Sequence, residues 1–426
     1  MRKSPNPKRA TATAWTVRTP TARTQTRTLP IPIQTARTHR ASLDRCIEPV
    51  EAERFLGEYW EQKPLLVPRD EEGRFEDLLS VAEVERLVAS GGLRRPAFRL
   101  AKEGEKLQLG DYTEDVSWQP LPFSGTARVE RVADEFERGA TIVLQALHVY
   151  HPPLARFCRD LERALGHPAQ ANAYYTPRSA QGFEIHHDTH DVFCVQVEGE
   201  KRWLVYPPVL ELPLRDQKYT EAMGEPGEAV LDVTLRAGDT LYLPRGWLHE
   251  ARTSESHSLH LTIGVATYTW LDALKAALEE TAREEVELRR AATMNAVRPE
   301  RLLQLVTPRL SPEAVMTRMR RRFVSSRRPV RDDLFDQLRA LEDLDLETPL
   351  AGNEMVIAQL SVDDEIASLT YEGRELRFPA RIAPELEFVL AAEEPFRLSE
   401  LPGSLNHEGR LVLARRLVRE GVLRIS

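Results

Sequence analysis

Three residues in two short segments have the types and spacing of a metal site. His186 and Asp188 stand two apart in GFEIHHDTHDVF, and His249 ends LPRGWLH. Successive side chains of an extended strand alternate between faces, so His186 and Asp188 are predicted to point together while His187 points away. Two imidazoles and one carboxylate leave three positions of an octahedral iron open, as in non-heme Fe(II) oxygenases. The pattern therefore predicts an enzyme.

A basic residue follows the first of these segments. Lys201 comes directly after Glu198-Gly199-Glu200, which we interpret as a hairpin turn, and it stands beside Arg202. One of the two cations could therefore point inward, although an ordinary solvated lysine is the alternative. A buried ammonium needs an anionic partner, and a dicarboxylate ligand would supply one.

The spacing around His249 carries a family resemblance. From Gly238 the chain reads Gly, five residues, Pro, one residue, Gly, two residues and His, which resembles the second cupin motif, with Thr253 in place of its usual Asn. Together with FLGEYWEQKPLLV, NAYYTP and SLHLTIG, the chain resembles the Jumonji-C ribosomal oxygenases over roughly residues 44 to 290. The resemblance implies a protein hydroxylase that uses Fe(II), 2-oxoglutarate and O2.

The resemblance also implies roles for individual residues. His186, Asp188 and His249 would hold the metal, whereas His190 lies beyond the position that the family uses. Lys201 would receive the distal carboxylate of 2-oxoglutarate. The residue pairs Asn172 and Tyr174, and His260 and Thr262, are each spaced to share one strand face, and they would contact the co-substrate or the metal ligands. Satisfied polar groups lining a barrel are the alternative for these four.

The substrate follows only from the resemblance. It implies hydroxylation of an Arg or His side chain on a ribosomal protein. An N-methyl-lysine demethylase is a second enzymatic possibility. A non-catalytic metal-binding cupin that acts as an adaptor is a third, which the intact ligand set and Lys201 argue against.

Composition limits the remaining classes. A chain of 426 residues with 42% hydrophobic content can hold two or three domains. Its 3 cysteines are too few and too scattered for a disulfide framework, so we expect a reducing, cytoplasmic compartment. No apolar run reaches the ~18 residues needed to cross a bilayer, and no secretory signal is visible, so no membrane association is expected.

Charge is distributed unevenly. Residues 1–43 contain nine Lys and Arg and no acidic residue, which leaves the rest of the chain at −17. We expect this Thr-, Pro- and Arg-rich tail to be disordered. It could be a nucleic-acid or ribosome-binding arm, an organelle transit peptide, or a dispensable extension upstream of the true start. Nucleic-acid binding elsewhere in the chain is not expected.

The patterns divide the rest of the chain into three parts. Residues 44–268 are predicted to form an α+β catalytic domain, a double-stranded β-helix barrel of cupin or jelly-roll type with flanking helices. Predicted elements are helices at 50–62 and 153–166 and a buried strand at 141–150. Residues 269–330 are predicted to be helical, with Leu271, Leu274, Leu278 and Ala282 on one stripe.

Two interpretations of that helical region remain open. It could pack on its own barrel, or it could be a dimerisation element, which the family resemblance favours and which implies a homodimer. The last part, residues 331–426, resembles a winged-helix domain. Arg410, Arg415, Arg416 and Arg419 punctuate its final apolar stripe, but the acidic surroundings argue against a nucleic-acid-binding helix.

Overall fold

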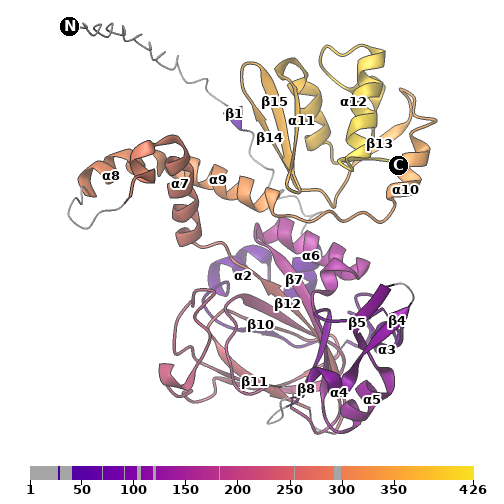
Figure 1. The fold of residues 1–426 in the computed structure, drawn as a ribbon, viewed down its shortest axis with the longest axis vertical. Coiled ribbons are helices and arrows are strands. Elements are labelled where there is room, and N and C mark those ends of the chain that lie inside the picture. Colours follow the sequence, from indigo (N-terminus) through magenta and orange to yellow (C-terminus); the bar gives the residue numbers. More distant parts are fainter. Residues whose placement is uncertain are drawn as a thin grey trace, which may run out of the picture.

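The protein has three parts in space: a β-barrel, a projecting group of helices and a C-terminal domain (Figure 1). The structure is a computed structural model, and it describes residues 27–28, 41–69, 71–90, 92–102, 107–118, 121–181, 183–253, 255–291 and 299–426. The tail predicted over residues 1–43 lies mostly outside the described residues. Among the helices of the described ranges, none combines the length and the apolar character that crossing a membrane requires.

A nine-stranded sheet forms the barrel, and its central path runs in the order β2-β10-β8-β12-β7-β6-β3, with β9 and β11 pairing with β8. All of its strand pairs are antiparallel. The strands are β2 (Leu65–Val67), β3 (Phe98–Ala101), β6 (Thr141–Leu144), β7 (Ala169–Thr176), β8 (Asp191–Tyr206), β9 (Leu231–Arg236), β10 (Thr240–Leu243), β11 (Leu248–Arg252) and β12 (Ser258–Val265). This is a cupin-like architecture, as the sequence predicts.

Strand β8 corrects one prediction, because Glu198-Gly199-Glu200 is not a hairpin turn. The chain continues as one strand of 16 residues. Gly199 has φ of 67°, and a Cβ built on it would lie 2.0 Å from the His257 carbonyl oxygen. Before Gly199 the strand pairs with β10 and β12, and after it with β9 and β11. The glycine therefore makes a corner at which the strand passes from one side of the barrel to the other.

Two apolar clusters fill the barrel. Phe193 belongs to the larger cluster, which extends under the flanking helices, and Trp203 to a smaller one formed by β8, β9 and β10. Both side chains are buried.

The flanking helices confirm the predicted pattern with shifted ends. Helix α6 (Pro152–Leu165) ends at Gly166, whose φ is 71°, as predicted for a left-handed C-cap. Helix α2 (Ala52–Glu58) is shorter than the predicted 50–62. The strand predicted at 141–150 ends at Leu144 because a 3-10 turn at Leu147–Val149 follows. The remaining elements here are α1 (Ala41–Ile47), α3 (Val81–Ala89), α4 (Leu109–Tyr112), β4 (Thr113–Trp118), β5 (Leu121–Ala127) and α5 (Val129–Glu137).

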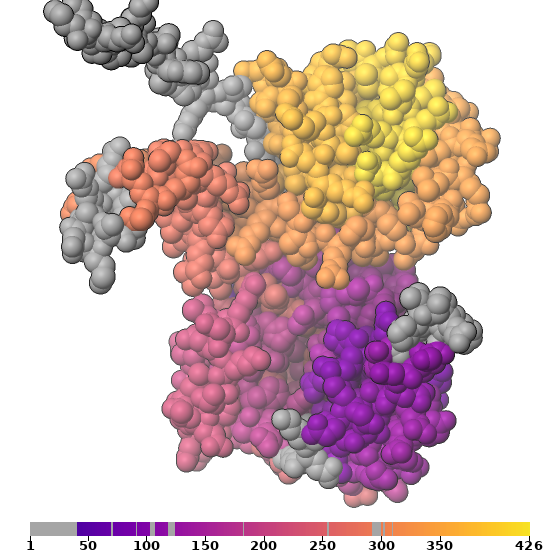
Figure 2. All heavy atoms as spheres, viewed as in Figure 1, coloured from indigo at the N-terminus to yellow at the C-terminus, as the bar shows by residue number. Residues whose placement is uncertain are grey.

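The middle region is helical, as predicted, and projects from the barrel (Figures 1 and 2). It contains α7 (Trp270–Glu284), α8 (Pro299–Val306) and α9 (Pro312–Ser325). Helix α7 begins with a capping box between Thr269 and Asp272. The predicted apolar stripe of α7 is largely uncovered in one copy of the chain, since Leu271, Leu274 and Leu278 are 40%, 43% and 44% exposed.

The C-terminal domain has its own apolar core. Strands β14 (Ala358–Val362), β15 (Ile366–Tyr371) and β16 (Arg374–Pro379) form a sheet, and the short β1 (Arg27–Thr28) pairs with β14. A second sheet has the order β17-β13-β18. Its strands and the helices of the domain are β13 (Pro349–Gly352), β17 (Phe396–Arg397), β18 (Leu423–Ile425), α10 (Leu334–Ala340), α11 (Ala383–Ala391) and α12 (His407–Arg419). The winged-helix interpretation of this domain remains a prediction.

Buried ion pairs join this domain to the barrel through α6. Glu162 of α6 pairs with Arg327, and both side chains are almost fully buried. Arg163 of the same helix donates to the backbone carbonyls of Glu354 and Val356. In α12, Arg410 donates to the carbonyls of Leu398 and Ser399, so this predicted surface arginine stabilises its own domain.

Candidate metal centre

The three predicted metal ligands come together at the barrel wall. His249 lies in β11, whereas His186 and Asp188 lie in an extended segment just before β8 rather than in a regular strand. His186 and His249 form an isolated β-bridge, in which each backbone N–H donates to the other's carbonyl at 3.1 and 2.8 Å. The backbone N–H of Gly246 donates to the Asp188 carbonyl at 3.0 Å. Backbone contacts therefore fix all three residues.

The side chains of these three residues converge. One ligand atom of each lies within 4.8 Å of the others. His249 Nε2 is 3.9 Å from Asp188 Oδ2, and the two imidazole centroids are 4.5 Å apart. Two imidazole nitrogens and one carboxylate form the donor set of a 2-His-1-carboxylate site.

The protonation of the site suits a metal. His186 Nδ1 lies 2.8 Å from the Glu184 carbonyl, and His249 Nδ1 lies 3.0 Å from the Trp247 carbonyl. A carbonyl only accepts, so each Nδ1 carries the proton and each Nε2 presents a lone pair. Burial, together with the nearby His186, lowers the pKa of His249. Burial alone would raise the pKa of Asp188, but the surrounding histidines hold it below its usual value. The donors are thus ready to bind a cation, and the residues fit Fe(II).

The neighbouring histidines have other positions, as predicted. His187 points away, and its Nε2 lies 2.9 Å from the Gln217 carbonyl in the loop before β9. His190 Nδ1 lies 3.9 Å from Asp188 Oδ1. Its ring packs over Gly264, where a Cβ would lie 2.5 Å from the imidazole. His190 therefore supports the carboxylate side of the site.

Lys201 is buried inside the barrel. Its side chain is 4% exposed, and Nζ donates to Thr176 Oγ1 at 3.1 Å. Among the described residues, no carboxylate forms an ion pair with it. Burial lowers the pKa of Lys201 to about 8, because the ammonium is separated from water. A buried cation with only a hydroxyl as its partner is a site for an anion.

Cys194 connects Lys201 with the metal ligands. Burial raises the pKa of this thiol, the charge of Asp188 raises it further, and the charge of Lys201 lowers it. Both charges are therefore close to Cys194, on the same strand as Lys201. The cation and the metal ligands therefore lie near each other inside the barrel, and we call this part of the barrel interior the chamber.

The four other predicted site residues form one patch in that chamber. On adjacent strands, His260 of β12 stands opposite Tyr174 of β7, and Thr262 stands opposite Asn172. The rings of Tyr174 and His260 are stacked, with centroids 5.0 Å apart. Asn172 Oδ1 already accepts a bond from the Ala146 backbone at 2.9 Å. His260 is fully buried, and its Nδ1 has no partner among the described residues, so this imidazole can accept or donate a bond to a ligand.

Sequence reasoning missed two contributors to the chamber. Thr176, which binds Lys201, comes from another strand and is linked to Thr141 at 3.1 Å. Trp203 belongs to an apolar cluster of the barrel, and its ring also lies 6.0 Å from that of His249 and 5.5 Å from that of His260. Alternation along β8 places Trp203 on the same face as Lys201, which is a signal that could have identified it.

Comparisons with known proteins define the class. Residues 144–273 match the JmjC domain family. This range includes the three predicted metal ligands and Lys201. The segment that matches the JmjC domain family therefore lies largely in the cupin-like barrel.

Relatives by sequence carry matching names. The chain is 33% identical over 278 residues to ribosomal oxygenase 1 of Gallus gallus, a match that covers 62% of this chain and 44% of that protein. It is 30% identical over 250 residues to the bifunctional lysine-specific demethylase and histidyl-hydroxylase NO66 of Drosophila persimilis, covering 58% and 35%. The chain thus spans less than half the length of these relatives. The predicted resemblance to Jumonji-C ribosomal oxygenases is confirmed.

Solved structures show the same fold. The ribosomal oxygenase YcfD of Escherichia coli matches with a TM-score of 0.54 and 18% identity, covering 88% of this chain and 98% of that chain. A structure of YcfD in complex with cobalt and 2-oxoglutarate matches with a TM-score of 0.53 and 18% identity, with the same coverage. The shared architecture extends over most of the chain.

Proposed function

We propose that this protein is an Fe(II)- and 2-oxoglutarate-dependent oxygenase that hydroxylates a protein side chain. The observation that carries the proposal is that the His186, Asp188 and His249 ligand set lies close to a buried lysine that no carboxylate of the described residues neutralises. A structure of the similarly folded YcfD in complex with cobalt and 2-oxoglutarate supports the proposal that this protein binds a metal ion together with 2-oxoglutarate.

The proposed roles follow from the positions of the residues. His186 and His249 would bind Fe(II) through Nε2 and Asp188 through a carboxylate oxygen. Lys201 and Thr176 would bind the distal carboxylate of 2-oxoglutarate. When bound, Fe(II), 2-oxoglutarate and O2 supply the oxidising chemistry, in which 2-oxoglutarate is converted to succinate and CO2 while one oxygen atom enters a C–H bond of the substrate.

The chamber walls have supporting roles. Tyr174, Trp203 and His260 form an aromatic face that excludes water around the anion site. Exclusion of water strengthens the attraction between Lys201 and a carboxylate. His260 Nδ1 and the hydroxyl of Thr262 could hydrogen-bond the co-substrate.

A ribosomal protein is the proposed substrate, with Arg or His as the hydroxylated residue. The names of the relatives support it, and the chain beyond residue 43 carries a net charge of −17, which favours basic partners. The name of the NO66 relative also supports the second candidate, demethylation of N-methyl-lysine. The non-catalytic adaptor is disfavoured because a structural metal site does not need an unneutralised lysine beside it.

We further propose that the protein is a homodimer through α7. The exposed Leu271, Leu274 and Leu278 form an apolar stripe on the projecting helices, and such stripes usually become buried against a partner. Sedimentation of the purified chain tests this directly: a dimer is expected, and Leu274→Glu with Leu278→Glu should give monomers.

The test of the enzymatic function is succinate formation. The purified, iron-loaded protein is supplied with 2-oxoglutarate and O2, with and without total ribosomal proteins, and the peptides are analysed by mass spectrometry. We expect stimulated turnover and a peptide heavier by one oxygen atom. Loss of a methyl group from lysine would identify the demethylase instead. Absence of turnover with bound iron would favour the adaptor.

A further inference from the structure

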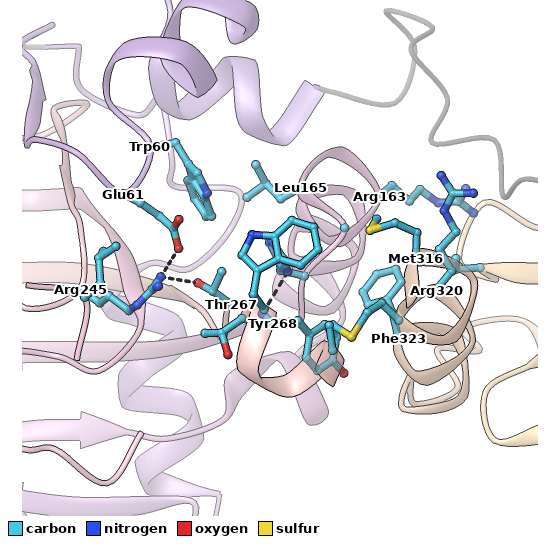
Figure 3. A pocket seen from close by; sticks show the side chains of 18 of the residues that line it. Trp60, Glu61, Arg163, Leu165, Arg245, Thr267, Tyr268, Met316, Arg320 and Phe323 are labelled. Atoms are coloured by element: carbon cyan, nitrogen blue, oxygen red, sulfur yellow. Dashed lines mark hydrogen bonds and ion pairs between the residues drawn. The ribbon is translucent and has the colours of Figure 1, made fainter. Parts of the chain in front are cut away.

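A second internal space lies away from the metal chamber, where the barrel meets the helices and the C-terminal domain (Figure 3). The cavity has a volume of about 540 Å³, which is within the usual range for small-molecule sites. None of the residues proposed to bind metal or 2-oxoglutarate lines it. It is therefore a separate space.

Aromatic and aliphatic side chains form most of the cavity wall. Trp60 comes from the segment after α2, Tyr268 and Trp270 from the start of α7, and Met316 and Phe323 from α9. Trp270 is 72% exposed, so an indole that could pack on a ligand is left largely in water. Methionines on a wall of this kind adapt to ligands of different shapes.

The two ends of the cavity differ in charge compensation. At one end Arg245 is neutralised by Glu61 and Asp191. At the other end the cavity is lined by Arg163 and Arg320 (Figure 3). Arg163 donates only to the carbonyls of Glu354 and Val356 in the described part of the chain.

Arg320 is less satisfied still. Its Nε is buried and has no hydrogen-bond partner within the described ranges. No ion pair with a described carboxylate is formed by it either, unlike Arg318 of the same helix, which pairs with Glu280. The charges of Asp160 and Glu354 act on Arg163, so Arg320 is the guanidinium group that leaves a local positive potential at this end of the cavity.

From this arrangement we propose that the cavity binds an amphipathic anion, a molecule with a carboxylate or sulfonate head and an apolar body. The head would pair with Arg163 and Arg320, and the body would pack between Trp60, Phe323 and the methionines. Neither the proposed oxygenase reaction nor the metal centre is needed for this binding.

The chemistry excludes simpler occupants. A neutral apolar molecule would leave the positive charge of Arg320 uncompensated, and a cation would be repelled by that charge. The remaining occupants are a segment of the same chain or a second copy, and either would block the cavity in solution.

The test is calorimetric titration of the full-length protein with decanoate, kept below the concentration at which it forms micelles, while Trp fluorescence is recorded. We expect saturable binding of decanoate and binding of decanol at least about tenfold weaker, since a hydrogen bond to a charged group is worth ~1.5–3 kcal/mol. Arg320→Met should weaken decanoate binding about tenfold without altering the melting curve. Arg321→Met is the matched control, because Arg321 is an exposed neighbour on α9, and it should change nothing.

A further arm separates this cavity from Lys201. Saturating 2-oxoglutarate with Mn²⁺ should leave decanoate binding unchanged. Competition by 2-oxoglutarate would place the decanoate in the metal chamber and overturn the proposal. An absence of decanoate binding would also overturn the proposal, and this is the result expected if the chain itself or a second copy fills the cavity. Equal binding of decanol would overturn it as well. So would an Arg320→Met variant that binds decanoate as tightly as the wild type.

Discussion

Lys201 and Arg245 are both buried cations of the same barrel, yet their surroundings are opposite. Arg245 is 7% exposed, and its guanidinium pairs with Glu61 and with Asp191 at 3.2 Å. Asp191 also accepts bonds from Tyr242 and Thr267, each at 2.8 Å. Lys201 is 4% exposed, and a threonine hydroxyl is the partner that the structure gives it.

The difference separates a structural cation from a binding cation. The charge of Arg245 is compensated within the chain by Glu61 and Asp191, so the cluster holds β10 against the segment after α2 and needs no anionic ligand. The ammonium of Lys201 costs free energy until an anion enters. An uncompensated buried charge beside a metal ligand set is therefore the feature that identifies the co-substrate site.

Loss of a metal ligand should have the largest effect. His249→Ala removes one of three metal donors. We expect the metal affinity to fall by more than about 100-fold, since mutating a residue that only hydrogen-bonds to a ligand already lowers the affinity by ~10–100-fold. Succinate formation should be abolished. Iron content and turnover measure the result. His257→Ala is the control, because His257 pairs with Glu198 at the barrel rim, and full turnover of His249→Ala would contradict the assignment.

Neutralising Lys201 should act on the co-substrate alone. Lys201→Met keeps the length of the side chain but removes the charge, so we expect the KM for 2-oxoglutarate to rise by about 30- to 1,000-fold, equivalent to ~2–4 kcal/mol. Iron binding and the melting temperature without ligand should not fall. A variant that loses stability but keeps its KM would show that Lys201 is structural.

Neutralising Arg245 should give the reverse result. Arg245→Met leaves Asp191 buried without its ion pair, and we expect the free energy of unfolding to fall by about 3–5 kcal/mol. Urea unfolding measures it. Arg202→Met is the control, because its exposed pair with Asp232 at 2.6 Å is screened by water and should contribute little to stability. If the two variants are equally stable, the Arg245 cluster does not hold the barrel as described.

The pH dependence sharpens the same comparison. With a pKa of about 8, Lys201 is charged in neutral solution and loses its proton as the pH rises above that value. We expect the affinity for 2-oxoglutarate to be constant below pH 8 and to weaken up to about tenfold per pH unit above it. Without ligand, stability should rise between this pKa and the unfolded value near 10.5, since only the unfolded chain then binds the proton. Lys201→Met should show neither trend.

The smallest effect is expected at Gly264. A Cβ there would lie 2.5 Å from the His190 ring, so Gly264→Ala should displace His190 from Asp188 and destabilise the fold by about 1–3 kcal/mol. Thermal unfolding measures the loss of stability, and the iron affinity measures the effect of displacing His190. Gly57→Ala in α2 is the control, because a Cβ there meets nothing within 4 Å, and it should be neutral or slightly stabilising.

The convergence of His186, Asp188 and His249 could be predicted from the sequence because its signals are local. The spacing of His186 and Asp188 and the Gly-Pro-Gly pattern before His249 each act over a few residues. The hairpin turn at 198–200 was predicted wrongly because only local signals were used. A glycine between two glutamates gives the same sequence pattern in a hairpin turn and at a barrel corner. The corner differs from a hairpin because β8 pairs with four different strands. The residues around Gly199 alone do not reveal this pairing.

Features that depend on distant residues could not be predicted. Thr176 meets Lys201 only because β7 and β8 face the same chamber. Arg163 and Arg320 share a cavity because α6 and α9 are brought together by the C-terminal domain. Helix α2 is shorter than its apolar periodicity suggests because Tyr59 to Lys63 form turns.

The most direct test of the central claim is an anaerobic titration of the iron-loaded protein with 2-oxoglutarate, followed by visible absorption. We expect a weak charge-transfer band that saturates in the wild type. In Lys201→Met the band should require at least about 30-fold more 2-oxoglutarate. In His249→Ala it should be absent. No band in the wild type, or the same titration curve in Lys201→Met, would contradict the claim that these residues form one site for iron and 2-oxoglutarate.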